Sequence, residues 1–231
     1  MKNLTWQNPE QLFVAQELIN KVKSKCCGIK DNKIRMVPVQ FIIQAATAEA
    51  CIKQAEAVLT AGGKWIELCV ASLSSKEAME VSAYLLKRCH ACEATFCVVD
   101  DVDLCREVGA DGVCLTREDC RVDEVREALG HEFIIGATAS SFERLKLLKR
   151  MSADYVSLCT TEGFEHLSEV ILKAHDEQLR LPISVQLAGA LGYVDAKKVI
   201  ESGADGVAMN CSAVLPVNLE EVINTLLHLD D

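Results

Sequence analysis

Carboxylates follow two short apolar runs near the middle of the chain. Asp100 comes directly after the run 96–99, and Asp119 closes the acidic pair that follows the run 113–115. An apolar run bounded by turn signals predicts a strand that is buried on both faces. A short helical stretch with a glycine-rich return separates the two runs, which makes a βαβ unit with parallel strands. Both carboxylates are therefore expected at the same, carboxyl-terminal edge of neighbouring strands.

This edge carries the chemistry in α/β sheets and barrels. Mg²⁺ is usually held there by one or two carboxylates together with the phosphates of a substrate. The spacing therefore indicates a Mg²⁺ site at Asp100 and Asp119. A second interpretation stays open from spacing alone, in which both side chains are solvated acids at the tops of loops.

The strand-and-helix unit repeats eight times, which predicts a TIM (βα)8 barrel. Strands are expected at 36–44, 64–70, 95–100, 112–117, 133–139, 155–159, 182–188 and 206–211. Amphipathic helices are expected near 47–61, 74–91, 102–108, 121–129, 141–151, 164–179, 193–202 and 218–229. We therefore predict a barrel over 36–231 and an N-terminal helical extension over 1–35, with its helix at 8–28.

The returns from helix to strand share a small-residue signature that includes Asp111, Asp154 and Asp205. Glycine ends a helix in the left-handed conformation, and an aspartate can accept hydrogen bonds from nearby backbone. These returns lie at the bottom of a barrel, where residues serve stability. We therefore interpret the three aspartates as structural.

The strand ends predicted to form the mouth contain neither lysine nor histidine, which excludes a Schiff-base lysine and the commonest general base. They offer acids, hydroxyls and Arg117, and two small-residue loops at 188–190 and 210–213. Barrels often bind a phosphate at the loops after strands seven and eight. Gly189 would let a ligand approach the backbone closely, although an ordinary turn explains one glycine equally well.

Composition narrows the class of protein. The chain has 231 residues, a net charge of −10 and 12 cysteines. The negative charge argues against nucleic acid or an anionic membrane as the main partner. No run of 18 apolar residues and no signal peptide is present, and the cysteines are scattered through apolar runs, so we expect a cytoplasmic protein. A homo-oligomer remains open.

Four segments together resemble a known family. They are VVDDVDLCREVGADGVCLTRED (98–119), IIGATASS (134–141), ADYVSL (153–158) and ESGADGVAMNCSAV (201–214). In this order and spacing they are similar to the thiamine phosphate synthases and their thiazole tautomerase relatives. The resemblance implies a transferase of thiamine biosynthesis, which joins a hydroxymethylpyrimidine pyrophosphate to a thiazole phosphate and releases pyrophosphate with Mg²⁺ bound by two aspartates.

By this resemblance, Asp100 and Asp119 would hold Mg²⁺, and Thr138 would stand near the pyrophosphate where the family has a serine. Gly189 and Ser212 would bind the thiazole phosphate. Arg117, which stands in place of a family glutamine, and Thr138 are the catalytic candidates. The implied partners are small phosphorylated substrates.

The chain also departs from the family pattern. Glu67, Cys69 and Ala71 replace a Gln-x-Arg-x-Lys pattern that grips the pyrimidine pyrophosphate, Val99 replaces an asparagine, Cys114 a histidine, and Ser140 the tautomerase histidine. Losing an arginine and a lysine would weaken pyrophosphate binding by roughly 10²–10⁴-fold. Two alternatives to a synthase with a degenerate pyrophosphate site therefore stay open: a non-catalytic or repurposed barrel that binds a phosphate ligand, and a thiazole tautomerase-like isomerase.

Overall fold

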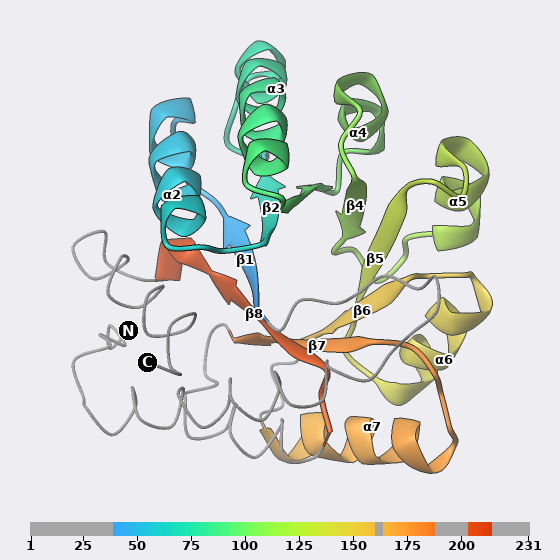
Figure 1. The fold of residues 1–231 in the computed structure, drawn as a ribbon. Coiled ribbons are helices and arrows are strands. Elements are labelled where there is room, and N and C mark those ends of the chain that lie inside the picture. The colour runs from blue at the N-terminus through green and yellow to red at the C-terminus, as the bar shows by residue number, and fades with distance from the viewer. Residues whose placement is uncertain (1–38, 160–163, 188–202, 214–231) are drawn as a thin grey trace, which may run out of the picture.

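Strands and helices alternate along the chain as the repeat predicted. The structure is a computed structural model that describes residues 39–159, 164–187 and 203–213 (Figure 1). The strands are β1 (Val39–Ile43), β2 (Trp65–Cys69), β3 (Thr95–Val99), β4 (Gly112–Leu115), β5 (Ile134–Ala139), β6 (Tyr155–Leu158), β7 (Ile183–Leu187) and β8 (Gly206–Asn210). The helices are α2 (Ala48–Thr60), α3 (Ser75–Ala91), α4 (Val102–Val108), α5 (Val122–Leu129), α6 (Phe142–Arg150) and α7 (Phe164–Asp176), and a 3₁₀ turn η1 (Cys211–Ala213) follows β8.

The eight strands are all parallel and pair in sequence order around a closed barrel. The first and last strands close it, with Val39 opposite Val207. This confirms the predicted TIM barrel. The predicted extension over 1–35, its helix at 8–28, the predicted helices near 193–202 and 218–229, and Gly189 lie outside the described residues. In the described part, no helix has the length and apolarity that a membrane span requires.

Helix starts follow the capping residues in the sequence. Thr47, Ser74 and Ser141 each accept a hydrogen bond from a backbone N–H in the first turn of the next helix. Ser74 and Glu77 form a reciprocal capping box at α3. At the other end of α4, Gly109 takes the left-handed conformation with φ 73°. These caps fix where each helix leaves the barrel wall.

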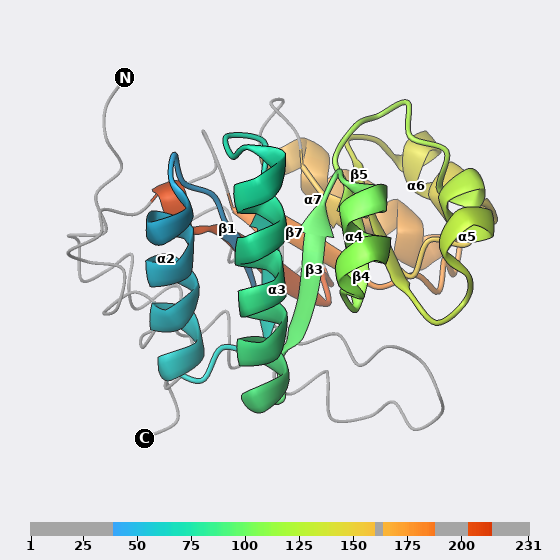
Figure 2. The same cartoon turned by 90° about the horizontal axis from the view of Figure 1, so that it is seen from above.

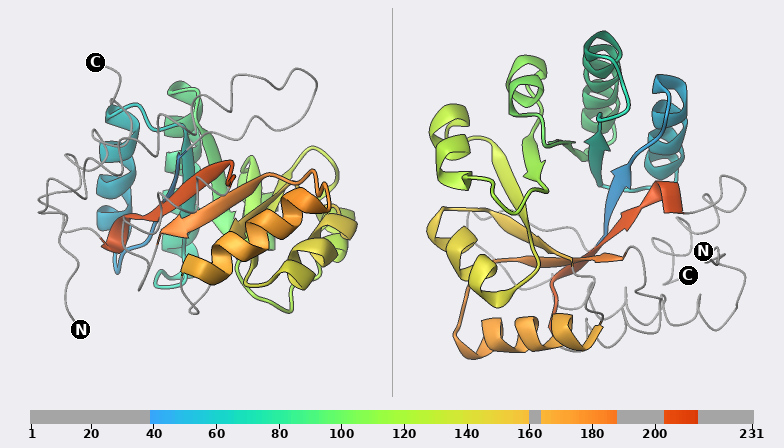
Figure 3. Two further views of the ribbon diagram at one scale, coloured as in Figure 1. Left: turned by 90° about the horizontal axis from the view of Figure 1, so that it is seen from below. Right: turned by 180° about the vertical axis from the view of Figure 1, so that it is seen from behind.

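Side chains alternate between the two faces of the barrel wall. One face of each strand packs against the helices and forms the larger core, which includes Phe41, Ile66, Val98 and Ile135. Helices α2, α3 and α4 stand side by side along one flank, and α6 packs beside α7 on another (Figures 2 and 3). The mouth of the barrel is built by the connections from each strand to its following helix.

The barrel interior holds a separate cluster of Trp65, Cys97, Val99, Cys114 and Tyr155. The Trp65 and Tyr155 rings meet edge to face, with centroids 5.4 Å apart. In the same interior, the Tyr155 hydroxyl donates to Oε1 of Glu67 at 2.7 Å.

Gly136 of β5 provides the space for this arrangement. A Cβ atom at position 136 would collide with the Tyr155 ring. The absence of a side chain on β5 therefore decides where the aromatic ring of β6 lies.

The return aspartates are structural, as predicted. Their carboxylates accept the N–H of the residue at or near the start of the preceding strand: Asp111 from Phe96 at 2.7 Å, Asp154 from Ile135 at 2.8 Å, and Asp205 from Ile183 at 2.9 Å. In each pair the N–H of the aspartate donates back to the carbonyl of the same residue. Each aspartate thus joins two strands at the bottom of the barrel.

Candidate active site

Asp100 lies directly after β3, at the mouth of the barrel, in a left-handed conformation with φ 58°. Its N–H donates to the carbonyl of Cys114 on the neighbouring strand at 2.9 Å. Its carboxylate accepts the Thr116 N–H at 2.6 Å and the Thr116 hydroxyl. Left-handed backbone is unfavourable for most residues, and aspartate is among those that tolerate it. The ends of β3 and β4 are therefore held together through Asp100.

Asp119 lies in the exposed loop that follows β4, the strand paired with β3. Its two carboxylate oxygens accept from the Arg117 guanidinium, with Nε–Oδ1 3.0 Å and Nη2–Oδ2 2.7 Å. This pair lowers the pKa of Asp119, first through the hydrogen bonds from Arg117, and raises the pKa of Arg117. The Arg117 and Asp119 side chains are 71% and 70% exposed. Solvent therefore screens the ion pair, and either side chain can change its partner at little cost in free energy.

The two aspartates suit a magnesium ion by ligand type. The described residues contain no group of three or more histidine, cysteine or acidic side chains placed to hold a metal ion. Mg²⁺ needs no such group, because one or two carboxylates and the substrate phosphates complete its shell. Each carboxylate oxygen has a second lone pair, so the hydrogen bonds to Asp100 and Asp119 leave room for a cation. That the two carboxylates share an ion stays a prediction.

Two further predicted residues follow other strands, Thr138 in β5, which pairs with β4, and Ser212 after β8. Thr138 pairs with Ser157 and is the last residue of β5 to alternate toward the barrel interior. Ser212 follows β8 in η1, where its N–H and hydroxyl both donate to Oδ1 of Asn210, at 2.9 and 2.7 Å. Asn210 in turn donates to Gln44 after β1 at 3.2 Å.

Two residues on helices reach the mouth and were missed by considering strand ends alone. His166, in the first turn of α7, places Nε2 2.9 Å from the carbonyl oxygen of Ser140. Because a carbonyl only accepts, Nε2 carries the hydrogen. Arg144, in the first turn of α6, donates to the carbonyl of Cys120 at 3.0 Å. The predicted strand ends contain no histidine, but His166 and Arg144 add an imidazole and a second guanidinium from the first turns of the following helices. No local pattern in the sequence marks either residue.

Four of the positions that depart from the family pattern lie in the barrel interior. Val99 and Cys114 belong to the interior cluster, Cys69 packs against it, and Glu67 is 2% exposed. Burial raises the pKa of Glu67, and the hydrogen bond from the Tyr155 hydroxyl opposes this only in part. Burial likewise raises the pKa of the Cys114 thiol well above its usual range. Apolar and thiol groups therefore surround a carboxyl where the resemblance expects cations.

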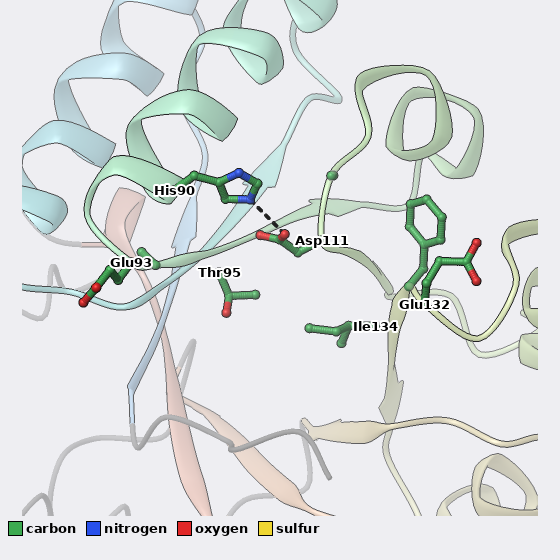
Figure 4. Close-up of a pocket in the computed structure, with 9 residues that line it drawn as sticks. His90, Glu93, Thr95, Asp111, Glu132 and Ile134 are labelled. Atoms are coloured by element: carbon green, nitrogen blue, oxygen red, sulfur yellow. Dashed lines mark hydrogen bonds and ion pairs between the residues drawn. The ribbon is translucent and has the colours of Figure 1, made fainter. Parts of the chain in front are cut away.

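A cavity of about 460 Å³ opens at the bottom of the barrel instead (Figure 4). Its lining includes His90, Glu93, Thr95 and Glu132 as well as the structural Asp111. His90 Nε2 lies 2.9 Å from Oδ1 of Asp111, whose other oxygen holds the start of β3. Because this face maintains the fold, the mouth remains the candidate site.

Comparison with known proteins agrees with the fold and identifies a family. The family model for thiamine monophosphate synthase (TMP-TENI) matches residues 39–213. A thiamine-phosphate synthase of Bacteroides fragilis is 30% identical over 187 residues, covering 76% of this chain and 91% of that protein. A thiamine phosphate pyrophosphorylase structure from Pyrococcus furiosus has a TM-score of 0.68 at 23% identity, covering 83% of this chain and 94% of that one.

The fold alone is also shared more widely. A structure described as native KDPGal reaches a TM-score of 0.68 at 10% identity, with 87% of this chain and 97% of that one covered. The family model, which spans the barrel from β1 to η1, is therefore the more specific finding. The chain belongs to the thiamine monophosphate synthase family.

Proposed function

We propose that this chain joins a hydroxymethylpyrimidine pyrophosphate to a thiazole phosphate and releases pyrophosphate, with Mg²⁺ held by Asp100 and Asp119. The observation that carries the proposal is the position of these carboxylates after the paired strands β3 and β4. Family membership and the thiamine-phosphate synthase relatives support the choice of substrates.

The reaction needs positioning more than acid–base chemistry. The lone pair of the thiazole nitrogen forms a bond to the methylene carbon of the pyrimidine, and the carbon–oxygen bond to pyrophosphate breaks with its electron pair on the leaving group. Mg²⁺, when bound, would offset negative charge on that leaving group. Thr138 would donate a hydrogen bond to the pyrophosphate, and Gly189 and Ser212 would hold the thiazole phosphate through N–H and hydroxyl groups.

Arg117 has a role in this scheme because its guanidinium is paired with the Asp119 carboxylate in the structure. A cation at Asp119 would weaken the attraction between the carboxylate and the guanidinium, and Arg117 would then turn to the pyrophosphate oxygens. The exposed pair favours such an exchange, since solvent screens the attraction between its two charges. Arg117 thereby replaces part of the charge missing at Cys69 and Ala71.

Incubating the full chain with both substrates, with and without Mg²⁺, tests the proposal. Thiamine phosphate should form only with Mg²⁺, and Asp100→Ala and Asp119→Ala should each abolish it. Arg117→Gln should raise the KM for the pyrimidine pyrophosphate or lower turnover. Given the missing cations, we expect turnover below the ordinary range of roughly 1–10³ s⁻¹. Product formation that is indifferent to both aspartates would overturn the assignment.

The closed interior cluster favours the alternative of a repurposed phosphate-binding barrel. Glu67, Cys69 and Cys114 supply no cation for a pyrophosphate. Under this alternative, calorimetry would detect inorganic phosphate binding but no Mg²⁺-dependent binding of the pyrimidine pyrophosphate. An isomerase is the third candidate, supported by the contact of His166 with Ser140; conversion between tautomers of the thiazole phosphate would identify it.

We place the reaction in a reducing compartment, the cytoplasm. The cysteines in the described part of the chain are free thiols, and most of them are buried. Buried thiols without disulfides are typical of proteins kept reduced.

A further inference from the structure

The loop 116–121, between β4 and α5, carries both Arg117 and Asp119 on an exposed stretch of backbone. Thr116 fixes one end of this loop through its hydrogen bonds to Asp100. At the other end, α5 begins without a side-chain cap, because Arg121 makes no such hydrogen bond. The direction of Asp119 therefore depends on what else holds the loop.

Arg144 of α6 lies beneath the loop and is only 9% exposed. Its Nη2 donates to the carbonyl of Cys120 at 3.0 Å, and its Nε lies 3.8 Å from Oε2 of Glu118. Glu118 and Cys120 are the residues immediately before and after Asp119. One buried guanidinium thus hydrogen-bonds the residue after the proposed metal ligand and forms an ion pair with the residue before it.

Glu118 extends this arrangement to the next strand and helix. Its Oε1 accepts the hydroxyl of Ser140 at 2.5 Å, and the carbonyl of Ser140 accepts from His166 of α7. The loop is therefore connected to the end of β5 and the first turns of α6 and α7. Burying a guanidinium is costly unless it is paired, and the Glu118 carboxylate is the counter-charge that the ion pair supplies.

We propose that Arg144 is a positioning residue that directs the Asp119 carboxylate toward the metal by holding Glu118 and Cys120. This inference rests on the proposed function, in which Asp119 is a metal ligand. Arg144 itself touches neither substrate nor metal. Partners that orient metal ligands in this way typically contribute 10–100-fold to metal affinity.

Mn²⁺ binding to the full chain, followed by electron paramagnetic resonance with and without inorganic pyrophosphate, tests the inference. Arg144→Met should weaken Mn²⁺ binding by about 10–100-fold. Arg144→Lys should restore part of it, because an ammonium can reach one of the two anchors but lacks the planar fork that reaches both. Arg150→Met is the matched control, since Arg150 lies exposed in the last turn of the same helix and should leave Mn²⁺ binding unchanged.

The outcomes separate this inference from the proposed function. If Asp119→Ala leaves Mn²⁺ binding intact, the proposed function fails. If Asp119→Ala abolishes binding but folded Arg144→Met binds Mn²⁺ like the unaltered chain, only the positioning role is overturned. Should Arg144→Met not fold, Glu118→Gln decides, because Glu118 is exposed and the amide keeps the size of the side chain and an oxygen that accepts the Ser140 hydroxyl; a folded Glu118→Gln chain with unchanged Mn²⁺ affinity would then refute the inference.

Discussion

At the scale of single residues, Glu67 is the feature that sets this chain apart. A carboxyl that is 2% exposed and surrounded by Trp65, Tyr155 and thiols has a raised pKa in the folded state because burial disfavours the charged form. In the unfolded chain the pKa returns to about 4.3. The folded state therefore binds the proton more tightly, and this residue subtracts stability as pH rises from that value through the raised pKa.

Glu67→Gln should therefore raise the free energy of unfolding at neutral pH, by on the order of 1–3 kcal/mol. The amide keeps an acceptor for the Tyr155 hydroxyl and cannot ionise. Denaturant unfolding between pH 5 and pH 8 measures the effect, and the advantage of the variant should grow with pH. Glu80→Gln is the control, because that exposed surface carboxylate should show no such trend. A gain that shrinks as pH rises would contradict a carboxyl whose pKa is raised by burial.

The Glu67 substitution also shows what residue types alone reveal. Its departure from the family glutamine was visible in the sequence. Its contact with Tyr155, which is 88 positions away, was not, because that contact requires the ring to lie over Gly136 on the next strand. A single glycine in a strand indicates close approach without saying of what.

At the scale of elements, the return aspartates are repeated joints between strands. Asp154 also pairs with an arginine, since its Oδ2 accepts the Ile135 N–H and lies 2.5 Å from Nη2 of Arg126, whose side chain is 10% exposed. Arg126 also donates to the carbonyls of Gly130 and Phe133. The end of α5 and the starts of β5 and β6 therefore meet at one carboxylate.

Asp154→Ala should lower the free energy of unfolding by about 3–5 kcal/mol, because it leaves a buried guanidinium without its counter-charge. Asp154→Asn should lower the free energy of unfolding by less, since the amide oxygen can still accept the Ile135 N–H. Urea unfolding monitored by circular dichroism gives the comparison. Asp103→Ala removes a surface partner of Arg106 whose side chain is 93% exposed, and should change stability by less than about 0.5 kcal/mol. Equal losses in the free energy of unfolding for Asp154→Ala and Asp103→Ala would refute the role of Asp154 in joining the strands.

Elements were the level at which sequence reasoning succeeded best. The predicted helix at 102–108 has the observed bounds, and the predicted strand at 155–159 ends one residue later than β6. Caps such as Ser74 and Gly109 act within a few residues, so their consequences can be read locally. His166 and Arg144 were missed because their contacts depend on how a helix packs beside a strand end, which no local pattern specifies.

At the scale of the whole molecule, the barrel and its activity are separable. The chain reaches the same TM-score of 0.68 with the thiamine phosphate pyrophosphorylase and with the native KDPGal structure. A shared barrel therefore leaves the chemistry undetermined, and the residues at the strand ends decide it. This is why repetition predicted the barrel, whereas the candidate site required Asp100, Asp119 and their neighbours to be placed in three dimensions.

Strands β1 and β8 meet at the seam that closes the barrel. Substitutions at this seam can test the stability of the fold separately from ligand binding. Asn210 donates to Gln44 across this seam, 166 positions away, and accepts from the N–H and hydroxyl of Ser212. Asn210→Ala should lower the free energy of unfolding by about 1–3 kcal/mol, because it leaves these donors and the Gln44 acceptor without their shared partner.

Ser212→Ala keeps the bond between Asn210 and Gln44, so it should cost less than about 1 kcal/mol of stability. It should nevertheless weaken inorganic phosphate binding by roughly tenfold or more, since a hydrogen bond to a charged group contributes about 1.5–3 kcal/mol. Isothermal calorimetry and urea unfolding on the same preparations measure both quantities. Ser74→Ala, which removes a helix cap away from the seam, should lose about 1 kcal/mol and bind phosphate unchanged. Phosphate binding that survives Ser212→Ala intact would remove Ser212 from the proposed thiazole phosphate site while leaving the seam in place.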